Sequence, residues 1–161
     1  MPKIVRNNAR GLFQKAGKGS AGIESVEMSA LTTSSTAAGN ADVTVTCPAG
    51  AVITDVGFVA VTLFDVGTNN ISFSCGVGSG GNDIVAVTQI NQANADIAAG
   101  TAISVKSANL VHGSGGAIAF KNAAPLHSAS ERTIGFRITN SGTQTSAGTF
   151  RAYIKYVILS E

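Results

Sequence analysis

The chain has 161 residues and a mass of 16.2 kDa, which suits one domain that can bury a core without help from metals or disulfides. Only 12% of its residues are charged, against about 25% in typical soluble proteins, so the composition favours a protein that works packed against neighbours, with simple compositional bias as the alternative. The sequence contains neither a run of about 18 apolar residues nor a signal peptide, so we expect no membrane partner and synthesis in the cytoplasm.

Charge is distributed unevenly along the chain. Residues 1–20 contain five basic residues and no acid, whereas the remaining residues contain six basic and nine acidic residues. This asymmetry predicts an extended basic arm over residues 1–22, followed by one domain over residues 23–161. Such an arm often meets an acidic partner, either protein, nucleic acid or membrane, although a solvated terminus without a partner is an equally good interpretation.

Alternating segments separated by polar turns predict the first strands of the domain. We expect a short strand within residues 26–31, a polar turn over residues 32–40 and a strand over residues 42–47. The sequence Cys47-Pro48-Ala49-Gly50 then predicts a turn into a long apolar strand, residues 53–64.

This long strand is apolar on both faces. A strand of an ordinary antiparallel sandwich alternates apolar and polar side chains, because one face meets water. We therefore expect the strand to be covered twice, the second time by another subunit, with Val59, Val61 and Leu63 facing a layer opposite to that of Val56, Phe58 and Ala60. The candidate subunit-interface residues are Val56, Phe58, Val59, Val61 and Leu63.

The rest of the domain predicts further strands and no long amphipathic helix. The expected strands cover residues 71–77, 101–106, 110–120, 134–139 and 150–159. Residues 84–90 fit a strand or one helical turn, and residues 93–98 fit a local helix. About eight strands with Gly, Asn and Ser turns predict an all-β fold, a single antiparallel β-sandwich of jelly-roll or immunoglobulin-like order. The missing tryptophan and the cysteine spacing disfavour a true immunoglobulin domain.

No motif for catalysis or cofactor binding is visible. The glycine-rich stretch 76–81 lacks the Lys and Ser/Thr of a phosphate-binding loop and is better explained as a hairpin turn. Cys47, Cys75, His112 and His127 are separated by 28, 37 and 15 residues, unlike the closely spaced ligand pairs of structural zinc sites. We expect no metal, no cofactor and no enzymatic activity. The cysteines should be small buried side chains, with a disulfide left open if their strands are neighbours.

The acidic residues are scattered singly, so no carboxylate pair for acid/base catalysis is visible. Asp55 lies within the apolar strand, where a buried ionised carboxylate is costly unless it is paired or solvated. We expect Asp55 to lie near the start of the strand or to be bonded to Arg or to backbone donors. The aromatic residues are mostly Phe at core positions rather than interleaved with basic residues, so we expect no specific nucleic-acid partner.

The chain resembles structural proteins of tailed bacteriophages. The resemblance is carried by Cys47-Pro48-Ala49-Gly50-Ala51-Val52-Ile53-Thr54-Asp55-Val56, by the strand end near Phe64-Asp65-Val66-Gly67-Thr68 and by Gly76-Val77-Gly78. It covers residues 43–105 and, more loosely, the C-terminal strand around Tyr153-Ile154-Lys155-Tyr156. Cys47 stands where an aliphatic residue such as Leu is expected, which fits a buried strand end.

The resemblance implies a jelly-roll head decoration, or cement, protein of the virion. Such a protein would stand as a homotrimer on the outer face of the phage head, with the arm lying across the major capsid protein or a neighbouring copy. The arm residues implied in this contact are Arg6, Arg10, Leu12, Phe13 and Lys15. The alternative is a tail or head-fibre component that binds a receptor or glycan through loops such as residues 78–82 and 112–116, although the scarcity of Trp and Tyr disfavours sugar stacking.

Overall fold

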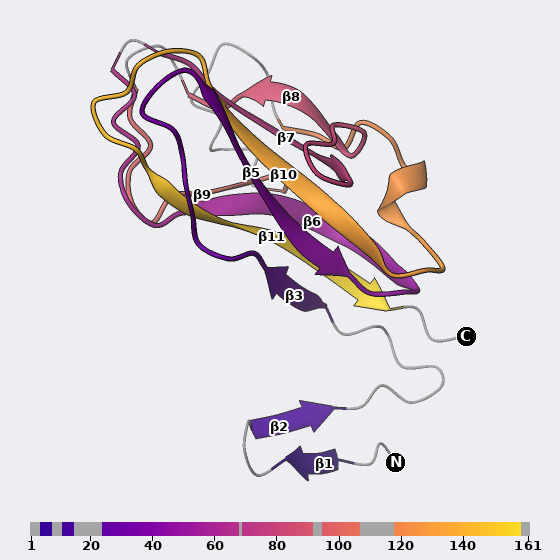
Figure 1. Ribbon diagram of the computed structural model, residues 1–161. Helices are drawn as coiled ribbons and strands as arrows, with labels where there is room; N and C mark the ends of the chain where they lie inside the picture. Colours follow the sequence, from indigo (N-terminus) through magenta and orange to yellow (C-terminus); the bar gives the residue numbers. More distant parts are fainter. Residues whose placement is uncertain are drawn as a thin grey trace.

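The computed structural model describes residues 24–67, 69–91, 95–106 and 118–158, together with the backbone of residues 4–7 and 11–14. The described part contains eleven strands and one short 3-10 helix, and its domain is an antiparallel β-sandwich of two sheets (Figure 1). The all-β sandwich predicted from the sequence is therefore confirmed.

The first sheet has four strands in the order β5-β10-β7-β8. Its members are β5 (Gly39–Cys47), β10 (Arg132–Asn140), β7 (Ile71–Val77) and β8 (Val85–Gln89). Strand β10 pairs with β5 along its whole length, from Arg132 opposite Cys47 to Asn140 opposite Gly39. Two of its three strand pairs join distant parts of the chain, because β10 lies between β5 and β7, whereas β7 and β8 are consecutive.

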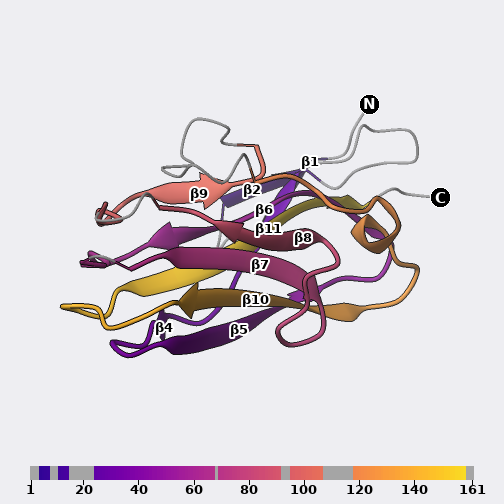
Figure 2. The ribbon, with the colours of Figure 1, turned by 90° about the horizontal axis from the view of Figure 1, so that it is seen from above.

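The second sheet has the order β3-β11-β6-β9, and a short strand β4 also pairs with β11. Its members are β3 (Ser25–Met28), β4 (Thr32–Thr33), β6 (Ala51–Ala60), β9 (Ala102–Ser104) and β11 (Thr149–Ile158). Figure 1 shows the two sheets as separate layers, with β7 and β10 above β6 and β11, and Figure 2 shows β8, β7, β10 and β5 of the first sheet side by side from above. The 3-10 helix η1 (Ala124–Leu126) lies in the segment that leads into β10.

Two further strands precede the domain. Strand β1 (Ile4–Asn7) pairs antiparallel with β2 (Gly11–Gln14), with Val5 opposite Phe13 and Arg6 opposite Leu12. They form a two-stranded sheet of their own, drawn apart from the sandwich in Figure 1. The arm predicted over residues 1–22 therefore contains a β-hairpin, whereas its boundary with the domain stays a prediction.

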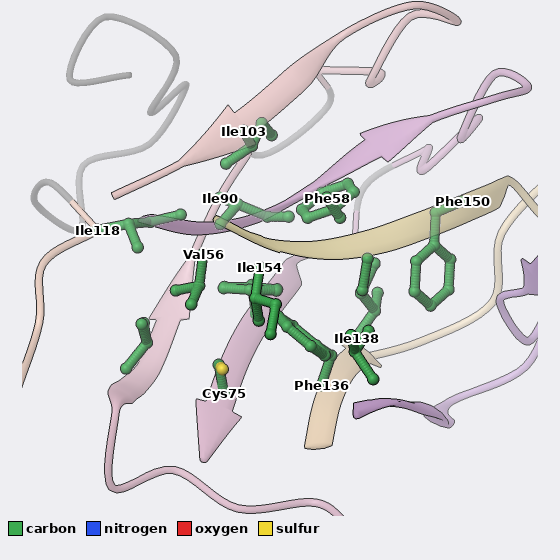
Figure 3. Close-up of a cluster of buried hydrophobic side chains, with 14 of the residues drawn as sticks. Val56, Phe58, Cys75, Ile90, Ile103, Ile118, Phe136, Ile138, Phe150 and Ile154 are labelled. Carbon is green, nitrogen blue, oxygen red and sulfur yellow. The ribbon is translucent and has the colours of Figure 1, made fainter. Parts of the chain in front are cut away.

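The core fills the space between the two sheets with aliphatic and aromatic side chains (Figure 3). Phe58 of β6 lies at its centre, with ring centroids 5.5 Å from Phe73 and 6.0 Å from Phe150. Phe136 of β10 extends this cluster, with its ring centroid 6.1 Å from that of Phe73. Full burial of each such side chain contributes about 1.5–3 kcal/mol, so this aromatic cluster is a main source of stability.

A β-bulge interrupts β6 and reverses which residues face the core. Lys155 pairs with Asp55 and Tyr156 pairs with Ile53, so Thr54 has no partner on β11. An extra residue of this kind shifts the alternation of a strand by one position. The buried core residues are Ala51 and Ile53 before the bulge and Val56, Phe58 and Ala60 after it. The strand looks apolar on both faces in the sequence because its core face changes from odd to even positions.

The strands predicted over residues 42–47, 71–77, 134–139 and 150–159 correspond to β5, β7, β10 and β11. The long strand predicted over residues 53–64 ends at Ala60 instead. The ladder stops there because the amides of Val61 and Thr62 both donate to Thr149 O. Of residues 84–90, the five residues Val85–Gln89 form strand β8, and the expected helix within residues 93–98 is absent from its described part, where Ile97 forms a bridge with Phe64. Most of the strand predicted over residues 110–120 lies outside the described residues.

Candidate assembly surfaces

The five candidate interface residues do not share one environment. Val56 and Phe58 are fully buried in the core between the two sheets, so both side chains already pack within one chain. Contact between these side chains and another subunit would require the sandwich to open. Val59 lies on the opposite face of β6 and is half-buried.

Val61 and Leu63 lie beyond the end of β6, where they are 44% and 43% exposed. Their side chains therefore remain available to a partner, and so does part of Val59. The expected second apolar layer over Val59, Val61 and Leu63 is not supplied by the described part of this chain.

The outer face of the second sheet mixes apolar and basic side chains in rows across its strands. One row places Val26 of β3 beside Lys155 of β11, and the next places Met28 beside Tyr153. A third row joins Arg151 of β11 to Val59 of β6. Val26 and Met28 are 51% and 49% exposed.

Exposed apolar side chains gather on this sheet. Of the eight large apolar side chains that the described part of the chain leaves exposed, six belong to strands of the second sheet or to segments next to them. These six are Val26, Met28, Leu31, Val61, Leu63 and Ile158. Scattered apolar side chains are normal on a protein surface, but their concentration beside one sheet marks a candidate contact surface.

Asp55 is the buried carboxylate of this face, and its partners explain its position. Its Oδ1 accepts a hydrogen bond from the backbone amide of Lys106 at 3.1 Å, and the Tyr153 hydroxyl donates to its Oδ2 at 3.5 Å. The prediction that Asp55 would bond to a backbone donor is therefore confirmed. Burial raises the pKa of the Tyr153 phenol, and the nearby Asp55 charge raises it further. This arrangement satisfies a buried charge in the bulged strand, which is a structural role.

The chain enters β3 across the same face. Thr54 Oγ1 donates to Glu24 Oε1 at 2.8 Å, and Lys106 Nζ lies 3.6 Å from the same carboxylate oxygen. Glu24 directly precedes β3, so these contacts hold the start of β3 against β6. Glu24 thus lies on the side of the second sheet where the exposed apolar and basic residues lie.

The outer face of the first sheet is polar by contrast. Asn40, Asp42, Thr44 and Thr46 project from β5, and each is exposed. Arg137 of β10 donates from Nε and Nη2 to the two carboxylate oxygens of Asp42, both at 2.7 Å. These hydrogen bonds lower the pKa of Asp42. A regular apolar-in, polar-out alternation of this kind is typical of a sheet face that meets water.

The glycine-rich loop 78–83 lies flat on that polar face. The Gly78 amide donates to Thr133 O, and Asp83 Oδ1 accepts from the Val77 amide. A side chain at Gly135 would collide with the backbone of Gly78, because the loop crosses β10 at that point. The loop is therefore packed against the sheet as a cover, rather than projecting as a recognition loop.

Buried amide side chains fix the loops at one end of the sandwich. Asn91 Oδ1 accepts from the Ile71 amide at 2.6 Å, while its Nδ2 donates to Asn69 O at 3.1 Å. Asn140 Nδ2 donates to the carbonyl oxygens of Ser35 and Ala37 at 3.2 and 3.1 Å. No sequence motif indicated these residues, because an isolated Asn in a loop has no distinctive pattern.

The cysteines and histidines considered for a disulfide or a metal site are far apart or lie outside the described residues. Cys47 and Cys75 are free and buried, and β10 lies between their strands, so they form no disulfide. Burial raises the pKa of both thiols. His127 forms a bridge with Val52, whereas His112 is outside the described residues. Within the described ranges, no group of three His, Cys, Asp or Glu side chains could hold a metal ion.

The structure describes only some of the residues that were predicted to form the arm contacts. Arg6 lies in β1, and Leu12 and Phe13 lie in β2, where the structure describes the backbone alone. Arg10 and Lys15 lie outside the described residues. No helix among the described residues has the length and apolar character needed to cross a membrane.

No family model matches the chain, and no curated protein matches it. Among solved structures, the chain is similar to one from the cyanophage Pam1 capsid asymmetric unit. The two share 18% sequence identity with a TM-score of 0.46, over 96% of this chain and 98% of that one. A similarity of this strength carries no argument about function.

Proposed function

We propose that this protein is a structural component of a phage virion that decorates the outer face of the head and stabilises it. The observation that carries the proposal is the concentration of six of the eight exposed large apolar side chains beside one sheet, in the described part of the chain. A surface of this kind suits permanent contact with other proteins. The low charge of the whole sequence supports the same interpretation.

The arm is the proposed attachment to the major capsid protein. Its basic residues would meet an acidic surface, while its apolar residues would enter pockets, and its strands offer main-chain hydrogen bonds to a partner strand. The proposed contacts are made by Arg6, Arg10, Leu12, Phe13 and Lys15. An isolated two-stranded hairpin is marginally stable in water, so contact with a partner would also stabilise the arm.

Self-association into a homotrimer is the second part of the proposal. Val59, Val61 and Leu63 are the side chains that would contact a neighbouring copy, because they remain at least partly exposed. Three copies would present three arms to the capsid. Binding through several weak contacts raises the overall affinity without any strong single contact.

Deletion of residues 1–20 tests the attachment. The truncated protein should fold, because the described core lies within residues 41–156, but it should no longer sediment with capsids that lack the protein. The full chain is the reference, and circular dichroism checks that the sandwich is intact. Normal decoration of capsids by the truncated protein would exclude the arm as the attachment.

The second candidate function is a tail or head-fibre component that binds a receptor or a glycan. The loops held by Asn91 and Asn140 favour it, because recognition loops work well on a rigid scaffold. Gold-labelled antibody against the protein, imaged on intact virions, separates the two candidates. Label spread over the whole head surface supports decoration, and label on the tail or on fibres that project from the head supports the alternative.

A further inference from the structure

Basic and exposed apolar side chains coincide on the outer face of the second sheet. This face carries three basic residues and two acidic ones: Glu24, which pairs with Lys106, and Asp55, which is buried and hydrogen-bonded. Outside this face, residues 1–20 of the sequence carry five basic residues and no acid, and the remaining residues carry three basic and seven acidic ones. The basic residues of the face are Lys106, Arg151 and Lys155.

The basic side chains of this face stand next to its exposed apolar ones. Lys155 and Val26 are direct neighbours across β11 and β3, as are Tyr153 and Met28. Arg151 is exposed and donates from Nη1 to Ser29 O at 3.0 Å, which holds its side chain toward the β3 edge. We call Val26, Met28, Arg151 and Lys155 the docking strip.

We infer that the docking strip binds an acidic protein surface that also exposes apolar side chains. Charge complementarity selects this partner, because Arg151 and Lys155, together with the five basic residues at positions 1–20 of the sequence, would repel a basic surface. The same repulsion argues against the arm of another copy as the occupant. The inference rests on the proposed function, under which the partner is the outer surface of the capsid and the strip lies against it beside the arm.

The inference is tested by binding of the full-length protein to capsids that lack this protein. Substitutions that remove charge or apolar surface are made in the docking strip and, as controls, elsewhere on the molecule. The double variant Arg151→Gln/Lys155→Gln should bind about tenfold more weakly at low salt and show a smaller salt dependence, because charges at an interface rim mainly steer association. Val26→Ser should also weaken binding. Lys121→Gln and Val87→Ser change the same chemistry on exposed residues away from the strip and should bind like the wild type.

Three results would be decisive: the first overturns the proposed function and with it the inference, and the other two overturn the inference alone. If the wild-type chain does not bind capsids, the proposed function fails and the inference falls with it. If the wild type binds and the strip variants bind equally well, the inference alone fails. If a strip variant lowers the sedimentation mass of the isolated protein, the strip is a contact between copies and not a docking surface for an acidic partner.

Discussion

Arg137 and Asp42 form a bidentate ion pair on the polar face of a molecule that has few charges. The two residues are direct neighbours across β10 and β5, and each carboxylate oxygen accepts one hydrogen bond at 2.7 Å. Gly80 of the covering loop lies against the guanidinium, which restricts its motion. This geometry makes the pair stronger than a flexible surface ion pair.

Removal of this pair should give a stability change that depends on pH. The pKa of Asp42 is lowered in the folded state, so its contribution is present above its unfolded value of about 4 and is lost as the pH falls through the lower folded value. Asp42→Asn should therefore lower the free energy of unfolding by about 0.5–1 kcal/mol at pH 7, and by progressively less below about pH 4. Chemical denaturation at several pH values measures the difference.

Arg137→Gln and the double variant complete a mutant cycle for this prediction. The coupling between the two positions should be favourable at pH 7 and should decline with the same pH dependence. An equal effect of Asp42→Asn at pH 7 and at pH 3 would show that the ion pair does not stabilise the fold.

At the scale of elements, the bulge in β6 determines the orientation of most of the strand. Thr54 is the additional residue. Ile53 before it and Val56 after it both face the core, because the extra residue shifts the inward-facing positions from odd to even numbers. A sequence pattern analysed with a constant period of two assigns half of such a strand to the wrong face. Ile53 and Asp55 are two residues apart, and in a regular strand they would face the same side. Because of the bulge, Ile53 faces the core and Asp55 faces the outer side of the sheet.

Deletion of Thr54 should be tolerated. Without it, Ile53 and Asp55 would be consecutive opposite Tyr156 and Lys155, so the core face stays unchanged and only the hydrogen bond to Glu24 is lost. We expect a cost of about 1 kcal/mol in the free energy of unfolding. Deletion of Gly57 is the matched control and should prevent folding, because Phe58 would move to the outer face. Thermal melting followed by circular dichroism distinguishes the two.

Regular alternation made some elements predictable from the sequence. Strands β5, β7, β10 and β11 were predicted because turn residues bound them and one face of each is apolar. The end of β6 at Ala60 was not predicted, because the apolar residues Val61 and Leu63 continue the pattern while the backbone leaves the ladder. Their exposure depends on how the chain turns there, which hydropathy does not encode.

At the scale of the whole molecule, the two sheets have unlike outer faces. The sequence alone could not show which strands, and therefore which side chains, form each face. Strand order decides this, since β11, from the end of the chain, lies between β3 and β6 and joins them into one sheet. Composition predicted only that some surface should meet a partner. The structure locates the exposed apolar residues beside the second sheet and covers part of the first sheet with its own loop.

Self-association is the prediction that belongs to this scale. Val61→Ser and Leu63→Ser together should weaken association between copies about tenfold or more, because both side chains would lose apolar contact area in the assembly. The stability of the isolated chain should change little, since neither side chain is buried. Sedimentation equilibrium over a range of concentrations measures association.

Val77→Ser with Val87→Ser is the matched control for that experiment. These two side chains are similarly exposed, at 45% and 60%, but belong to the first sheet. Equal association of both double variants and the wild type would exclude Val61 and Leu63 as subunit contacts.

The two buried cysteines make the protein convenient for site-specific labelling. Cys47 and Cys75 are the only cysteines of the sequence, both are shielded from solvent, and burial raises the pKa of their thiols, so at neutral pH they stay protonated and inaccessible to maleimides. A single cysteine introduced at an exposed position such as Val26 would then react alone. Fluorescent or spin labels can thus report the surroundings of each face without removal of a native thiol.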